Sequence, residues 1–579
     1  MSVRCDVPRP QVDMGADQVM MQDIAKQDAA KVGALPWGRT DVSILLAVMA
    51  FTLAFGMTHV RWHIQPFEDS LMLLRYADHL AHGAGIVWNI GDKPVEGATD
   101  FLFLVCVSGV MKLTGMHPIL ACRALLLVCQ VAGAGFLYYG TRRLFGAGRV
   151  LAASLALFYA VGPGVLHITG GFSPPFYGLM AMVAWFFACK AVVDGPTDAT
   201  SFGFALVALL MALTRPDGLV LAVLMGVAIL YALRGRSVRM LTIAFGVFLV
   251  LGGAYFLWRY HYFGYLLPNP FYKKGGGHLY PESMKFSITN VLKMILPVTP
   301  VVWFAAAKKS LRQRAVFLLI PVVGFACVWI LLTTENNWNM RFQYVLLPIT
   351  LMTIPYLAGG LKKAEAAMSW SRTMSVATVA AALLASLMYW RVTFPPAAAD
   401  GSSMHDIAVS LAQFKDKGYT MAITEAGTLP YFSAWRAIDT WGLNDPHMMH
   451  DPHGLTDAYL DESRPAIIMY HVGLESPAEF RHVWLGDGGP VAGPQKFNGP
   501  LSHYAVTHDY ELVARWGPSP CNLHVWYVRR DIPDFEAIKR IIQGQPHFFL
   551  DGGPIATNYM QTEPPMVCGD PGEHLGWRD

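Results

Sequence analysis

Long apolar runs, separated by short polar or charged connections, fill the first two thirds of this chain. Runs of roughly 17 to 22 apolar residues can cross a hydrocarbon core of about 30 Å as helices. The pattern therefore predicts a polytopic α-helical membrane protein with about 11 transmembrane helices. The candidate spans lie near residues 41–60, 118–140, 149–166, 173–193, 202–214, 217–233, 240–259, 285–305, 315–333, 342–360 and 374–390.

The pattern changes after residue 390. Short runs typical of β-strands, at 419–424, 466–472 and 524–528, stand among Gly, Pro and Asp residues, and 405–415 has a helical pattern. We expect a soluble α/β domain over residues 391–579, following a membrane domain over residues 41–390.

Composition supports the membrane assignment. Of the 579 residues 54% are hydrophobic and 15% charged, and the mean hydropathy is +0.36. A soluble protein carries about a quarter charged residues. The net charge of +3 is too small to indicate a nucleic-acid partner. Residues 1–40 have no apolar core with a cleavage site, which predicts a cytoplasmic N-terminal tail and a retained signal anchor at 41–60.

Basic residues predict the orientation, because Lys and Arg are retained on the cytoplasmic side. Four connections can all be cytoplasmic if residues 61–117 form one outer loop. The apolar run 100–114 then lies on the outer leaflet instead of crossing it. The soluble domain becomes extracytoplasmic, which suits a bacterial inner (plasma) membrane protein. The basic residues of the four connections are Arg142, Arg143, Arg149; Arg234, Arg236, Arg239; Lys308, Lys309, Arg312, Arg314; and Lys362, Lys363.

The same topology gathers the unusual polar segments on the outer side. These are residues 171–175, 215–218, 260–284 and 335–341, together with the adjacent acids Glu68 and Asp69 after the first span. A carboxylate pair held over the bilayer suggests chemistry on a lipid-borne substrate. We expect an extracytoplasmic active site.

Several motifs carry a family resemblance: Glu68–Tyr76, Gly83–Asn89, Val95–Thr99, Leu213–Gly218, Gly264–Lys273, Arg341–Phe342, Glu425–Tyr431 and Ile438–Asp445. In this order they resemble the GT-C membrane glycosyltransferases, in particular the mycobacterial-type terminal arabinofuranosyltransferase group. Three motifs depart from the family. Glu68-Asp69 replaces a pair of aspartates, 170–175 lacks the acid of a Ser-Gly-Leu-Glu-Thr-like motif, and Gly97–Thr99 replaces an aromatic-rich Gly-Tyr-Thr. The resemblance implies a GT-C fold and a polyprenyl-phosphate sugar donor, with arabinofuranose as one candidate sugar. The acceptor would be a glycan, a glycolipid or a protein.

Glu68 and Asp69 are the candidate catalytic residues. Glycosyl transfer needs a carboxylate near the acceptor oxygen, and cations where the phosphate leaves. Adjacent acids point about 100° apart on a helix, so one of the two would face the site. Either could act as a base or bind a divalent cation (Mg²⁺, Mn²⁺ or Ca²⁺), and the resemblance favours Glu68. The alternative is that both acids only stabilise a helix N-terminus.

Other residues of the outer segments are candidates for binding the donor. Lysine and arginine suit a lipid phosphate, while amides, carboxylates and aromatic rings suit a sugar. For each of them a snorkelling side chain, an internal ion pair or a turn residue is the alternative. The candidates are Arg75, Tyr76, Asn89, Glu96, Arg215, Asp217, Asn269, Lys273, Lys274, Trp338 and Arg341.

In the soluble domain, aromatic and acidic residues within eleven positions are weak candidates for acceptor binding: Trp435, Asp439, Trp441 and Asp445. The nineteen histidines show no metal-ligand spacing, and His447, His450 and His453 are expected to be loop residues. Cys521 and Cys568 could form a disulfide, or remain reduced.

Two rival functions differ from a transferase. A flippase or transporter needs ionisable residues along a path through the bilayer midplane, whereas here they gather at one face. A GT-C paralogue without catalytic activity is compatible with the altered acidic motifs.

Overall fold

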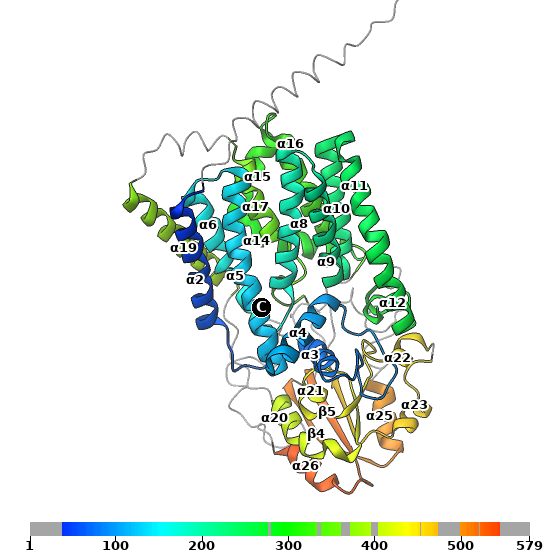
Figure 1. Cartoon of the computed structure of the whole chain (residues 1–579). Coiled ribbons are helices and arrows are strands. Elements are labelled where there is room, and N and C mark those ends of the chain that lie inside the picture. Colours follow the sequence, from blue (N-terminus) through cyan, green and yellow to red (C-terminus); the bar gives the residue numbers. More distant parts are fainter. Residues whose placement is uncertain are drawn as a thin grey trace, which may run out of the picture.

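The computed structural model describes residues 37–275, 279–332, 337–359, 371–394, 403–451, 453–472, 498–519 and 522–544. A helical bundle forms one end of the molecule and a domain with a β-sheet forms the other (Figure 1). The predicted Cys521–Cys568 disulfide, the lysines at 362 and 363 and most of the N-terminal tail lie outside the described residues.

The bundle is built from apolar segments in chain order. Its elements are α2 (Arg39–His59), α5 (Pro118–Phe145), α6 (Arg149–Ala160), α7 (Gly164–Gly170), α8 (Pro174–Asp194), α9 (Asp198–Thr214), α10 (Pro216–Leu233), η1 (Arg234–Ser237), α11 (Val238–Val247), η2 (Phe248–Gly252), α12 (Gly253–Phe263), α14 (Pro281–Ile295), η3 (Leu296–Val298), α15 (Thr299–Ala307), α16 (Arg312–Val328), η4 (Trp338–Met340), α17 (Leu346–Leu357) and α19 (Arg372–Thr393).

Within the described residues, seven helical runs are long and apolar enough to cross a membrane, and α4 (Phe101–Thr114), α9 and α17 are shorter apolar helices. One of the seven, Pro216–Phe263, contains the turn η1, and its two limbs α10 and α11 both pack against α9. The predicted polytopic helical fold is confirmed, while the number of crossings stays a prediction.

The connections α5–α6, α10–α11 and α15–α16 lie at the end of the bundle away from the sheet domain (Figure 1). At that end Asp41 is fully buried and forms ion pairs with Arg142 at 2.7 Å and with Arg149 at 3.0 Å. The basic residues of these three connections are therefore far from the sheet domain, as one cytoplasmic face would require. Which side of the membrane this end of the bundle faces stays a prediction.

Three helices lie between the bundle and the sheet domain: α3 (Glu68–Ala81), α4 (Phe101–Thr114) and α13 (Asn269–Gly275). At 1.5 Å per residue the 14 residues of α4 extend about 21 Å, which is short of the roughly 30 Å hydrocarbon core. Helix α4 packs against α3, α5 and α9 at this junction. This agrees with the prediction that residues 100–114 do not cross the membrane.

The C-terminal domain has a five-stranded sheet in the order β2-β1-β3-β5-β4. Strands β1, β2 and β3 are parallel, and β5 pairs antiparallel with β3 and β4. Its elements are α20 (Ser403–Leu411), η5 (Ala412–Lys417), β1 (Thr420–Ile423), α21 (Thr428–Ser433), β2 (Arg436–Asp439), α22 (Pro446–His450), α23 (Asp457–Ser463), β3 (Ile467–Val472), α25 (Asn498–Thr507), β4 (Tyr510–Ser519), β5 (Asn522–Arg529) and α26 (Phe535–Gln543).

Alternate residues of the central strands enter different cores, because side chains of a strand alternate between its faces. Met421 and Ile467 join a core that also contains Leu74 of α3 and Phe103 of α4. Ile468 joins a separate core under α25. One face of the sheet is therefore packed in continuity with the outer-loop helices, which fixes the soluble domain against the membrane domain.

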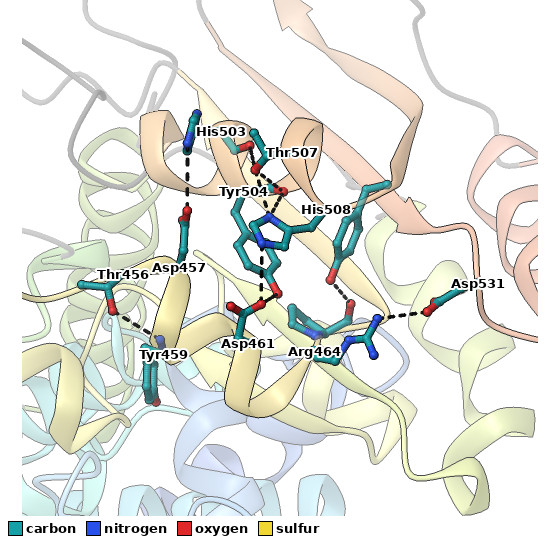
Figure 2. Close-up of polar contacts among 12 residues, drawn as sticks. Thr456, Asp457, Tyr459, Asp461, Arg464, His503, Tyr504, Thr507, His508 and Asp531 are labelled. Atoms are coloured by element: carbon teal, nitrogen blue, oxygen red, sulfur yellow. Dashed lines mark hydrogen bonds and ion pairs between the residues drawn. The ribbon is translucent and has the colours of Figure 1, made fainter.

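Polar contacts hold α25 on α23 at the opposite face of the sheet (Figure 2). The Tyr504 hydroxyl donates to Asp461 at 2.9 Å, and His508 lies 3.7 Å from the same carboxylate. His503, which is largely exposed, lies 4.0 Å from Asp457. These contacts are peripheral to the junction.

Candidate functional site

Charged side chains from separate elements meet where the bundle faces the sheet domain. We call this group the Asp–Arg cluster; it contains Asp69, Asp100, Ser173, Arg215, Asp217 and Arg341. Its members come from the start of α3, the residue before α4, the start of α8, the α9–α10 break and the segment before α17. The tertiary structure thus joins residues separated by up to 272 positions.

Asp69 and Arg341 form one half of the cluster. The guanidinium of Arg341 donates from Nη2 to Oδ2 of Asp69 at 2.6 Å, and its carbon lies 4.2 Å from the centre of the Phe172 ring. The side chain of Asp69 keeps 22% of its exposure, whereas that of Arg341 keeps 9%. A partly open carboxylate beside a buried guanidinium suits a base next to an anion-binding group.

Arg215 organises the other half. It stands between α9 and α10 with extended backbone dihedrals, and Pro216 begins α10, which ends the α9 hydrogen-bond ladder there. Its guanidinium contacts Asp217 at 3.0 Å and Asp100 at 3.5 Å. The Ser173 hydroxyl donates to Asp100. The predicted alternative, an internal Arg215–Asp217 pair, is present, but Asp100 and Ser173 extend it into a network.

Buried polar atoms next to the cluster have no hydrogen-bond partner among the described residues. They are both ring nitrogens of His167, the hydroxyl of Tyr177 and Nε of Arg341. His167 and Tyr177 are fully buried. Trp338 links the groups, since its ring lies 6.3 Å from that of His167 and 5.5 Å from that of Phe172. Buried polar groups are normally satisfied, so this arrangement suits an incoming polar ligand or water.

Glu68 points to the other side of α3. Its carboxylate accepts hydrogen bonds from the backbone N–H groups of Gly427 and Thr428, the latter at 3.0 Å, and from the Thr428 hydroxyl. A side chain at position 427 would collide with the backbone of Glu68, so only glycine permits this approach. Burial, together with the nearby Glu425 carboxylate, raises the pKa of Glu68 to about 7. Glu68 therefore joins α3 to the soluble domain.

Because Glu68 and Asp69 have separate partners, they do not share one metal site. Helix α3 carries both acids in its first turn, as the alternative interpretation expected. Glu68 is predicted to be catalytic, but both of its carboxylate oxygens accept hydrogen bonds from the soluble domain. Asp69 is the better placed of the two.

Arg75, Tyr76 and Asn89 do not reach Asp69 or Glu68. Arg75 donates to the backbone carbonyls of Trp88, Pro430 and Trp435 and to the Asn89 amide oxygen. The Tyr76 hydroxyl donates to Asn444 at 3.1 Å, and Asn89 pairs with both backbone groups of Ala437. All three side chains are buried. The donors of Arg75 thus tie the outer loop to the soluble domain, and the donor-binding role predicted for these three residues stays a prediction.

Glu96 and Asn269 form a second tie at the junction. The Glu96 carboxylate is buried and pairs with Arg259 of α12, and the Asn269 backbone N–H donates to the Glu96 carbonyl at 3.2 Å. The Asn269 amide oxygen lies 3.3 Å from Nε2 of His450. Lys273 and Lys274 belong to α13, but their side chains lie outside the described residues. Their predicted phosphate contact stays a prediction.

The predicted acceptor residues of the soluble domain serve the fold. Trp435 is 2% exposed and its indole N–H donates to the Leu411 carbonyl, so no ring face is open to a sugar. Asp439 is fully buried and accepts backbone N–H groups of Trp441, Gly442 and Asn444. Asp445 caps α22. These contacts give Trp435, Asp439 and Asp445 structural roles, and the acceptor role predicted for them stays a prediction; Trp441 is partly buried beside them.

Three ligand-type side chains converge at the end of the parallel strands, and the sequence did not reveal them. Glu425 follows β1, and His471 of β3 lies opposite His524 of β5. Their ligand atoms all lie within 4.8 Å of one another, so the group could hold a metal ion. No spacing rule joins residues 425, 471 and 524; only the strand register brings them together.

The signals that could have revealed Asp100 and Ser173 were weak. Asp100 precedes an apolar run as an ordinary helix-start residue, and Ser173 sits in a Ser-Pro-Pro segment that reads as a helix start. A helix start is a sufficient structural explanation for both residues, so neither residue indicated a functional site.

Comparison with known proteins identifies the fold. The family model of a domain of unknown function (DUF8728) matches residues 397–534. No curated protein matches the chain. The crystal structure of ArnT from Cupriavidus metallidurans bound to undecaprenyl phosphate is similar, with a TM-score of 0.57 and 13% identity over 83% of this chain and 97% of that one.

Two further structures give lower scores. The oligosaccharyltransferase of Archaeoglobus fulgidus has a TM-score of 0.48 and 9% identity over 84% of this chain and 75% of that one. The mycobacterial arabinofuranosyltransferase AftD has a TM-score of 0.47 and 13% identity over 86% of this chain and 40% of that one. The chain has the GT-C membrane glycosyltransferase fold that its motifs predicted, as the ArnT likeness shows.

Proposed function

We propose that this chain is a membrane glycosyltransferase that moves a sugar from a polyprenyl phosphate to a hydroxyl acceptor. The observation that carries the proposal is the Asp–Arg cluster, which lies at the junction of a GT-C bundle with a sheet domain. The similar ArnT structure has undecaprenyl phosphate bound. Arabinofuranose remains our candidate sugar, and a glycan, glycolipid or protein remains our candidate acceptor.

In this proposal the bond between the sugar's anomeric carbon and the phosphate oxygen breaks, and the acceptor oxygen takes the sugar. The acceptor proton passes to the Asp69 carboxylate, which is the more exposed partner of its ion pair. Polyprenyl phosphate leaves with the bonding electrons, and its growing charge is stabilised by Arg341 and Arg215.

Arg341 must therefore exchange partners during the reaction. At rest it is paired with Asp69. A lipid phosphate that takes over the guanidinium would release Asp69 to the acceptor, so donor binding and activation of the base become linked. The unpartnered Nε of Arg341 and the buried His167 offer further hydrogen bonds to such an anion.

The location is part of the proposal. A bacterial inner membrane with the N-terminus in the cytoplasm and the sheet domain in the periplasm would place the cluster at the outer face. The gathering of basic connections at the opposite end of the bundle supports this orientation (Figure 1).

The test uses the full chain in lipid nanodiscs with synthetic polyprenyl-phosphate sugars and a cell-envelope glycan fraction as acceptor. We expect release of polyprenyl phosphate that falls by about 10²- to 10⁴-fold in Asp69→Asn and is also reduced in Asp100→Asn. Translocation of the donor across vesicles without cleavage would identify a flippase. Donor binding without cleavage would identify an inactive paralogue, and either result would overturn the proposal.

A further inference from the structure

The carboxyl ends of β1 and β3 form an edge of the sheet where ligand-type side chains meet. Oε1 of Glu425 lies 2.7 Å from Nδ1 of His471, and Oε2 lies 2.9 Å from Nε2 of His524. The two imidazole rings stack with centres 4.2 Å apart and planes inclined by 22°. Ligands in α/β folds commonly bind outside the carboxyl ends of parallel strands.

The strand register makes this arrangement rigid. His471 and His524 are direct partners in the antiparallel β3–β5 pair, so their side chains lie on the same face of the sheet. The backbone N–H of His471 donates to the Thr424 hydroxyl at 3.0 Å, which fixes the residue before Glu425 against β3. Two paired strands and the segment after β1 therefore hold the three side chains together without a ligand.

The donor atoms fit a transition-metal ion. Two imidazoles and one carboxylate form the ligand set of many zinc sites that keep a fourth position open. In tetrahedral zinc with bonds near 2.0–2.1 Å, neighbouring ligand atoms are about 3.3 Å apart. The present oxygen–nitrogen distances of 2.7 and 2.9 Å need only a small expansion to admit the ion. The three side chains are 8% to 24% exposed.

Among the residues that the structure describes, no other group of three His, Cys, Asp or Glu side chains brings its ligand atoms this close. Other histidines of the same domain have different contacts: His447 stacks on Tyr459, and His450 stacks on Tyr265. The convergence is therefore not a general consequence of a histidine-rich domain.

We propose that Glu425, His471 and His524 bind one zinc ion, separate from the Asp–Arg cluster. The ion would fasten β3, β5 and the segment after β1. That segment continues into Gly427 and Thr428, which bind Glu68 at the start of α3. The site would thereby stabilise the contact between the soluble domain and the membrane domain. This inference does not depend on the proposed transferase activity.

The first test measures bound metal. Full-length protein in detergent is stripped with a chelator, dialysed against micromolar zinc chloride and analysed for zinc by mass spectrometry. We expect about one zinc per chain in the wild type, and a loss of that equivalent in Glu425→Gln, His471→Asn and His524→Gln. These substitutions keep the approximate size and the hydrogen-bonding capacity of each side chain.

His503→Ala is the matched control, because His503 is an exposed histidine of the same domain whose contact is with Asp457 (Figure 2). It should retain the zinc. Zinc should also raise the thermal unfolding temperature of the wild type and of His503→Ala by several degrees, but not that of His524→Gln. Equal zinc binding by wild type and triad variants, or no zinc in the wild type, would overturn the proposal.

A measurement on the wild type alone avoids any folding defect of the variants. X-ray absorption at the zinc edge should report two imidazole ligands and oxygen ligands around the bound ion. A spectrum without imidazole scattering would also refute the assignment.

Discussion

The two sides of helix α3 show how neighbouring residues can have opposite environments. Glu68 faces the soluble domain and is held by backbone N–H groups of Gly427 and Thr428. Asp69, the next residue, faces the bundle and pairs with Arg341. One carboxylate connects domains, whereas the other belongs to a charged group with a partly open face. A rotation of about 100° on a helix is enough to separate these roles.

The division is less sharp further along the helix. Arg75, seven residues after Glu68, lies on the Glu68 side and donates to backbone carbonyls of the soluble domain. Tyr76, seven residues after Asp69, lies on the Asp69 side, yet its hydroxyl donates to Asn444. The charged residues of the Asp–Arg cluster instead lie at the ends of helices. Polar residues of α3 can therefore contact the soluble domain from either side of the helix.

The largest expected effect separates the two acids directly. Asp69→Asn should lower the turnover number by about 10²- to 10⁴-fold, because it removes the proposed base. Glu68→Gln keeps an acceptor oxygen for the soluble domain and should have a much smaller effect. Donor cleavage by purified protein in nanodiscs measures both.

Asp78→Asn is the control for this comparison, since Asp78 lies on α3 with a half-exposed side chain next to His82. Its turnover should match the wild type. A greater loss of turnover in Glu68→Gln than in Asp69→Asn would reverse our assignment of the two sides.

The next effect concerns the anion-binding group. Arg341→Gln should raise the donor KM by about 10- to 100-fold, as expected for a lost hydrogen bond to a charged group. Arg239→Gln, which changes an exposed arginine paired with Asp198, should leave the KM unchanged. An unchanged donor KM in Arg341→Gln would show that Arg341 does not bind the donor phosphate.

A smaller effect tests the docking side. Arg75→Ala leaves buried carbonyl groups of Trp88 and Trp435 without a donor and should destabilise the protein by about 3 kcal/mol. Arg436→Gln is the matched change at the same seam, because Arg436 is half exposed and pairs with Asp92; it should cost at most about 1 kcal/mol. Thermal unfolding in detergent compares the stability of the two variants. Equal losses of stability would contradict our proposal that Arg75 holds the outer loop on the soluble domain.

The smallest effect is a pH dependence of the docked domain. Burial raises the pKa of Asp439 to about 6, even though backbone N–H groups and the side chain of Asn444 donate to it. The folded chain thus takes up this proton at a higher pH than the unfolded chain. The group should therefore add about 1 kcal/mol of stability between pH 7 and pH 5.5.

The difference in unfolding temperature between wild type and Asp439→Asn isolates this contribution, because other groups titrate in both proteins. That difference should shift in favour of the wild type as the pH falls. A shift in the opposite direction would show that the N–H donors, and not burial, dominate at Asp439.

Much of the fold follows from local patterns. The predicted strands 419–424, 466–472 and 524–528 correspond to β1, β3 and β5, because β-rich runs between turn residues have few other solutions. The short apolar run 100–114 forms α4, a helix shorter than the hydrocarbon core, as its length suggested. The edge strands β2 and β4 carried no comparably clear signal and were missed.

The candidate site was only partly predictable. Asp69, Arg215, Asp217 and Arg341 were recognised because charges are expensive next to a membrane and stand out in an apolar sequence. Their pairing could not be derived, since it depends on how helix ends meet. Arg75 attracted attention for the same reason, and Asn89 because an amide suits a sugar, yet both satisfy backbone groups of another domain.

The amino-acid sequence by itself determined the class of protein, the order of its apolar helices and the chemical types available at the outer loops, because hydropathy and periodicity are local properties. Tertiary structure alone decided which acid faces the bundle and which cation it meets, and it alone assembled Glu425, His471 and His524. Those outcomes depend on helix rotation, strand register and domain docking, which are set by packing between distant segments.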